Sequence, residues 1–267
     1  MIENAITIIE FLKKILDIIK SDSKKSAAII DEIRCDEKEY LIWKWHPKGT
    51  EAGESSRENA IRFGSMLRVK ENEVVVFIYN HHGEQIQDYI EGPFDHVIAT
   101  SNLPFIADFL DKIYKGGTPF PAEIYYINMA KMLQMRFAVP YFDVFDRKYQ
   151  DIAVPVAVRG NFNFRISDCK AFVKIHGLNN FDIGELQKRI RAAISRCVKT
   201  YMNNMLEEYN ISILQIESKI GDITEKIEQI LCPVLNKEFA IEILRVDITA
   251  IEIDKFSEGY NELKRKN

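Results

Sequence analysis

The chain has 267 residues, a formal net charge of −4 and a hydrophobic content of 46%. This length holds one large domain or two modest ones, and the apolar content is ample for a core. The slightly acidic balance argues against a general nucleic-acid binder, so we expect no nucleic-acid partner. The four cysteines lie far apart, without the close spacing of a zinc ribbon or redox motif, which predicts free thiols.

Residues 2–19 form the first feature in chain order. Apolar side chains recur there at intervals of three and four, which predicts an amphipathic helix. The apolar positions that we assign to membrane or partner contact are Ala5, Ile8, Ile9, Phe11, Leu12, Ile15, Leu16 and Ile19. The same segment contains Glu10, Lys13, Lys14 and Asp17, which cost about 2.5–3.5 kcal/mol each near a bilayer centre, more than the apolar residues gain. We therefore do not expect this helix to span a membrane.

Two interpretations of the 2–19 helix stay open. Its wide apolar face fits an interfacial anchor that enters the headgroup region of a membrane. The same face also fits a helix that packs on another subunit or on the body of the protein. A polar run at 21–26 predicts a hinge, so we treat residues 1–25 as a separate N-terminal element.

Short apolar runs, each closed by a turn signal, fill residues 40 to 105 and predict an antiparallel meander. The predicted strands cover residues 40–46, 61–69, 73–79, 85–90 and 94–99. A short helix at 103–114 and a further strand pair at 120–137 follow. Trp43, Trp45 and His46 favour a strand that places one indole in the core over a surface that stacks bases.

The second half of the chain alternates strands with longer helices. Residues 152–158 and 162–166 predict two strands joined at Arg159-Gly160. Asp182 followed by Glu185 is a capping box that predicts a helix to Tyr209. The remaining predicted elements are a short helix at 168–176, a helical stretch at 211–235 with a possible break at Gly221, a strand at 244–250 and a charged tail from 254.

The order of these elements resembles an SPFH domain (stomatin, prohibitin, flotillin, HflK-C; band 7), and is closest to the bacterial branch labelled virion-core-protein-like. The carriers are Phe63-Gly64-Ser65, the strand at 73–77, Gly92-Pro93, and residues 100–104, 117–120 and 159–162. The resemblance covers residues 36–253. It implies an α+β fold with a bent antiparallel sheet subdomain at 36–158 and a smaller subdomain of helices packed on a sheet at 159–253. A charged tail at 254–267 follows. Relatives typically continue into a long assembly helix, which we do not expect here.

Candidate chemical sites are few. The pair His81-His82 indicates a hairpin turn rather than a metal site, because adjacent strand residues point to opposite faces. Asp143, Asp146 and Arg147 fit either a carboxylate pair or, as we favour, a loop with a local ion pair. We expect no catalytic residue, no metal and no cofactor.

A basic side is predicted for the helix that follows Asp182. Its members are Lys188, Arg189, Arg191, Arg196 and Lys199. A solvated face explains such a run, and contact with anionic lipid headgroups or an acidic partner is the alternative.

Together these features predict a non-enzymatic scaffold that self-assembles peripherally on the cytoplasmic face of the cell membrane. It would organise lipid or recruit partner proteins, which by resemblance include membrane-stress proteins. The alternative is a soluble oligomeric adaptor whose N-terminal helix binds a partner protein.

Overall fold

The computed structural model describes residues 32–47, 60–61, 65–81, 84–98 and 120–266. The helices predicted at 2–19 and 103–114 lie outside these residues. The chain divides into two compact units, one of Met1–Asp36, Lys44–Glu71 and Val76–Ile124, the other of Glu37–Trp43, Asn72–Val75 and Tyr125–Asn267. The domain boundaries drawn from the sequence stay a prediction. The predicted α+β class with antiparallel sheets is confirmed.

The strands up to residue 128 form three small sheets within the described residues. They are β1 (Glu32–Ile33), β2 (Ile42–Lys44), β3 (Ala60–Ile61), β4 (Met66–Val69), β5 (Glu73–His81), β6 (Glu84–Glu91), β7 (Phe94–Val97), β8 (Phe120–Pro121) and β9 (Glu123–Asn128). Their sheet orders are β1-β4-β7, β2-β9-β5-β6 and β3-β8. Strand β5 is buried from Glu73 to Tyr79, and Trp45 is buried, which confirms that the WKW segment gives an indole to the core.

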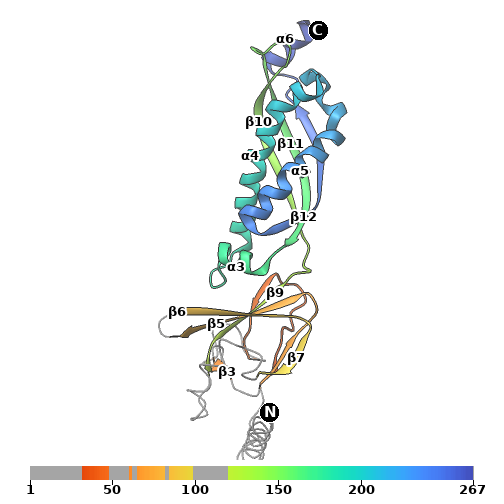
Figure 1. The fold of residues 1–267 in the computed structure, drawn as a ribbon. Helices are drawn as coiled ribbons and strands as arrows, with labels where there is room; N and C mark the ends of the chain where they lie inside the picture. The colour runs from red at the N-terminus through yellow and green to blue at the C-terminus, as the bar shows by residue number, and fades with distance from the viewer. Residues whose placement is uncertain (1–31, 48–59, 62–64, 82–83, 99–119, 267) are drawn as a thin grey trace, which may run out of the picture. The chain divides into compact units, whose positions relative to one another are not determined.

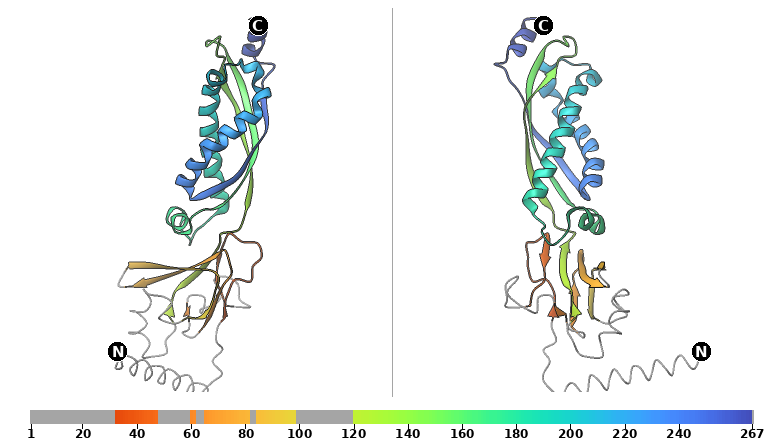
Figure 2. Two further views of the ribbon diagram at one scale, coloured as in Figure 1. Left: turned by 45° about the vertical axis from the view of Figure 1, so that its right-hand side comes forward. Right: turned by 90° about the vertical axis from the view of Figure 1, so that its left-hand side faces the viewer.

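A long antiparallel sheet dominates the rest of the chain (Figure 1). It consists of β10 (Leu133–Phe145), β11 (Ala153–Ile166) and β12 (Ile241–Ile253), in the order β10-β11-β12. The helical elements are α3 (Cys169–His176), α4 (Ile183–Tyr209), the 3-10 helix η3 (Ile213–Lys219), α5 (Ile220–Phe239) and α6 (Glu258–Lys266). Helices α4 and α5 lie side by side along one face of the sheet, as both views in Figure 2 also show.

Helical periodicity explains this packing. Ile190, Ile194, Val198 and Met202 recur every four residues on α4, and none of them is exposed. Helix α5 has the same four-residue spacing of buried apolar side chains, at Ile223, Ile227, Leu231 and Leu235. Each helix therefore buries one continuous apolar stripe. Alternate residues of β10 and β11 supply the facing side chains.

The prediction of two strands joined at Arg159-Gly160 is wrong, because β11 runs without interruption from Ala153 to Ile166. A Cβ atom on Gly160 would lie 2.4 Å from the Asp247 carbonyl oxygen and 2.6 Å from the Phe137 ring. The register with β12 also shifts between Arg159 and Gly160. The glycine therefore permits a close approach within a long strand rather than a reversal of the chain.

The helix boundaries follow capping chemistry. Asp182 Oδ1 accepts a hydrogen bond from Gly184 N at 2.7 Å, so α4 begins where the sequence predicts. The helical stretch predicted at 211–235 is two segments, with a 3-10 turn that changes to α-helix just before Gly221. The charged tail contains a further helix, α6, that the sequence reading did not anticipate.

Candidate functional site

The predicted site residues fall into two groups. The eight apolar residues of the 2–19 segment lie outside the described residues, and their contact role stays a prediction. The five basic residues lie on α4, within the described part of the chain. The five side chains differ in their surroundings.

Arg189 and Arg196 face α5. The Arg189 guanidinium lies 5.5 Å from the centre of the Phe239 ring, within the range of a cation–π contact. Arg196 Nη2 lies 2.6 Å from Glu238 Oε1, and both side chains are exposed to a large extent. These two residues help to hold α4 against α5, although an exposed ion pair of this kind contributes only about 0–1 kcal/mol.

Arg191 and Lys199 face β10 instead. Arg191 Nε donates to the Arg136 carbonyl oxygen at 3.4 Å. Lys199 Nζ lies 5.6 Å from the centre of the Phe142 ring. Lys188 stands apart from both flanks and is 79% exposed, with Glu185 Oε2 3.9 Å from its ammonium. Four of the five basic residues on α4 therefore already contact neighbouring elements, and Lys188 is largely exposed.

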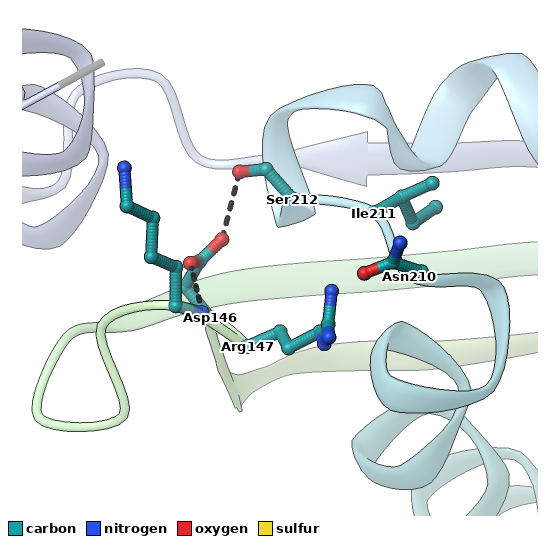
Figure 3. A pocket seen from close by; sticks show the side chains of 6 residues that line it. Asp146, Arg147, Asn210, Ile211 and Ser212 are labelled. Atoms are coloured by element: carbon teal, nitrogen blue, oxygen red, sulfur yellow. Dashed lines mark hydrogen bonds between the residues drawn. The ribbon is translucent and has the colours of Figure 1, made fainter.

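A small pocket of about 350 Å³ lies where the turn after β10 meets the chain between α4 and η3 (Figure 3). Asp146, Arg147, Lys148, Asn210, Ile211 and Ser212 line it. Asp146 is 1% exposed, and its carboxylate points to the Ser212 hydroxyl. Asp143 lies in β10 with an exposed side chain, so the two carboxylates do not form the pair that one interpretation of the sequence allowed.

Asp146 has a structural role in this pocket. Its Oδ2 atom accepts hydrogen bonds from Ser212 Oγ and Ile213 N, at 2.7 and 3.0 Å. Its Oδ1 atom accepts from Lys148 N and Tyr149 N, at 2.9 and 3.3 Å. Burial raises the pKa of this carboxyl, but the four hydrogen bonds outweigh burial and leave the pKa below its usual value. An ionised carboxylate fully used as an acceptor is suited to holding two loops together.

The His176 imidazole packs among aromatic rings. Its ring lies 4.5 Å from the Phe172 ring and stacks on Phe239, with centroids 6.2 Å apart and planes inclined by 7°. Its Nε2 lies 3.1 Å from the Phe239 carbonyl oxygen, which can only accept, so Nε2 carries the proton. Burial lowers the His176 pKa most, and the Arg189 charge lowers it further.

Sequence reasoning missed two arginines that lie near Arg191. Arg136 on β10 and Arg159 on β11 line one depression together with Arg191. Apolar and polar residues alternate along each strand, and this pattern marks both arginines as exposed. Only the register of β10 on β11 shows that the two lie close together. Within the described residues, no group of three or more His, Cys, Asp and Glu side chains is placed to hold a metal ion.

The comparison with protein families gives a clear result. A family model described as "SPFH domain-Band 7 family" matches residues 55–263, which is well over half of the chain. The search of individual curated proteins found no match. Across the described residues, no helix has both the length and the apolar character needed to cross a membrane. The order of strands and helices and this match agree, and the chain belongs to the SPFH domain–band 7 family.

Proposed function

We propose that this protein is a non-enzymatic scaffold that associates peripherally with the cytoplasmic face of the membrane, self-assembles there, and organises lipid or recruits partner proteins. The observation that carries the proposal is the family match over residues 55–263, because membrane-associated scaffolding is the general role of this family. The apolar face of the predicted 2–19 helix would bind the membrane. Membrane-stress proteins are the partners that the family resemblance suggests.

The open face of the β10-β11-β12 sheet supports a scaffolding role. Helices α4 and α5 cover one face, and the other exposes charged side chains joined by ion pairs. Arg159 pairs with Glu252 at 3.2 Å and Arg165 with Glu242 at 2.8 Å, in both cases between neighbouring strands. A sheet with one covered face and one polar face offers a broad, ordered surface for a protein partner.

Exposed aromatic side chains at one end of this sheet support self-association. Tyr141 and Phe145 of β10 are 54% and 53% exposed, and Phe256, between β12 and α6, is 95% exposed. Asp254 N donates to the Pro155 carbonyl oxygen at 2.9 Å, and Pro155 pairs with Asp143 of β10. The segment that carries Phe256 therefore leaves the sheet near the end of β10. Aromatic residues are enriched where protein surfaces meet, so we assign these three side chains to contact between copies.

A flotation assay tests the membrane role. The full chain is mixed with vesicles of phosphatidylcholine alone or with phosphatidylglycerol, and the same is done with a variant that carries Ile9→Asp, Leu12→Asp and Leu16→Asp. We expect the full chain to float and the variant to remain at the bottom of the gradient. Because three buried carboxylates would be costly in the headgroup region, the loss should be nearly complete.

Thermal unfolding of the same two proteins separates anchoring from folding. An unchanged transition in the variant supports the anchor, and a lost transition shows that the three residues belong to the core. If the full chain fails to float even with anionic lipid, the protein acts instead as a soluble oligomeric adaptor, whose mass light scattering would give.

A further inference from the structure

Three arginines from three different elements meet at the outer margin of β10. Arg136 comes from β10, Arg159 from β11 and Arg191 from α4. They line a depression of about 680 Å³ together with Phe137, Ala138, Gly160, Asn161 and Thr249. Three of these lining residues are arginines and none is acidic, so the lining itself carries a net positive charge.

The strand register places the first two arginines together. Arg136 pairs with Asn161, and Arg159 pairs with Ala138, so the two arginines are diagonal neighbours on β10 and β11. Diagonal neighbours on one sheet face lie about 7–8 Å apart. Both side chains are exposed. Ala138, the register partner of Arg159, adds only a methyl group to this part of the surface.

Arg191 completes the group from the neighbouring helix. Its Nε atom donates a long hydrogen bond to the Arg136 carbonyl oxygen at 3.4 Å, which places the side chain at the margin of β10. Among the described residues, neither Arg136 nor Arg191 has a carboxylate partner, and Arg159 has one, Glu252 Oε2 at 3.2 Å. Three guanidinium charges thus share a single carboxylate.

Arginine keeps its positive charge in proteins, so the repulsion between these guanidinium groups is not relieved by loss of a proton. A bound anion would relieve it, because a phosphate group presents oxygens in the spacing that the planar guanidinium fork contacts in pairs. We propose that the depression formed by Arg136, Arg159 and Arg191 is a binding site for a phosphate group, either free or as a phosphate monoester on a lipid headgroup. The inference is independent of the proposed membrane anchor, because it concerns a different part of the chain.

Calorimetric titration of the full chain with inorganic phosphate, at constant ionic strength, tests the site. We expect saturable binding that Arg136→Gln or Arg191→Gln each weakens about tenfold, the loss of one bidentate contact. The double variant should show no saturable binding. Arg245→Gln is the matched control, because Arg245 is 70% exposed, lies in β12 and pairs with Asp247 at 2.8 Å. It removes the same charge and should leave phosphate affinity unchanged.

Vesicles distinguish the source of the phosphate. Flotation is compared for phosphatidic acid, which carries a phosphate monoester, and phosphatidylglycerol, which does not. Stronger binding to phosphatidic acid that the double variant loses and Arg245→Gln keeps would assign the site to lipid. Equal binding to both lipids, with phosphate titration still dependent on Arg136 and Arg191, would assign it to a soluble ligand.

The proposal is overturned if phosphate does not bind saturably, or if Arg245→Gln weakens binding as much as Arg136→Gln and Arg191→Gln. Thermal unfolding without phosphate confirms that each variant is folded. Should the glutamine variants be unstable, Arg136→Lys and Arg191→Lys keep the charge and lose the fork. We expect them to bind phosphate more weakly than the unaltered chain, and unchanged affinity would also overturn the proposal.

Discussion

The Ser212 hydroxyl donates a 2.7 Å hydrogen bond to Asp146, 66 residues earlier in the chain. Three backbone N–H groups complete the coordination of this carboxylate, two from its own turn and one from the first residue of η3. Because Asp146 is 1% exposed, water does not compete for these bonds. This one side chain therefore joins the β10–β11 turn to the start of η3, just after α4.

Replacing Asp146 should destabilise the protein. We expect Asp146→Ala to lower the free energy of unfolding by about 2–3 kcal/mol, because several buried donors lose their acceptor. Urea-induced unfolding measures this change. Asp143→Ala is the matched control, since Asp143 is exposed, and it should change stability by less than about 0.5 kcal/mol. Equal losses for the two variants would contradict the structural role of Asp146.

The free energy of unfolding should depend on pH because of His176. Burial among aromatic rings lowers the pKa of its imidazole in the folded state below the usual 6.5. The imidazole therefore binds a proton more readily in the unfolded chain than in the folded one. Stability is lost as the pH falls below about 6.5. We expect the free energy of unfolding to decrease between pH 7.5 and pH 5.5, and His176→Gln to flatten this decrease. A variant with the same pH slope as the unaltered chain would show that other groups cause it.

Gly160 and Gly221 should respond in opposite ways to alanine. A Cβ on Gly160 meets the Asp247 backbone oxygen at 2.4 Å, and backbone cannot rotate away, so Gly160→Ala should cost about 1–3 kcal/mol. A Cβ on Gly221 meets no atom within 4 Å. Because Gly221 lies in α5, Gly221→Ala should stabilise by about 0.5–1 kcal/mol. Urea unfolding of both variants checks the pair, and a neutral Gly160→Ala would argue against a tight β11–β12 approach.

Self-association should depend on Phe256. This side chain is 95% exposed and touches little of its own chain, so Phe256→Asp should lower the assembly mass in light scattering without changing the thermal transition. Met132→Asp is the control, because Met132 is 55% exposed and lies before β10, away from Phe256 in the chain. A Phe256→Asp protein that keeps its full mass would remove this residue from the contact surface.

Local signals in the sequence predict the helices well. The cap at Asp182 and the four-residue spacing from Ile190 fix both the start and the buried stripe of α4, because both act within one or two turns. The charged tail gave no comparable signal, and α6 was missed. Gly160 misled the strand prediction, because a glycine that permits close packing looks the same in sequence as a glycine that makes a turn.

The candidate sites depend on contacts between distant segments, which sequence periodicity does not contain. Asp146 reads as a loop residue until Ser212 lies beside it. Arg136 and Arg159 read as ordinary exposed strand positions, and only the β10–β11 register and the position of α4 place them with Arg191. The basic residues of α4 likewise contact two different elements, α5 and β10, and the sequence alone could not identify either contact.

Flotation of the full chain beside a version without residues 1–20 tests the membrane-scaffold account most directly. The account predicts that the full chain rises with the vesicles, whereas the shortened chain stays behind and unfolds at the same temperature. A shortened chain that still rises, or a full chain that never does, would contradict it.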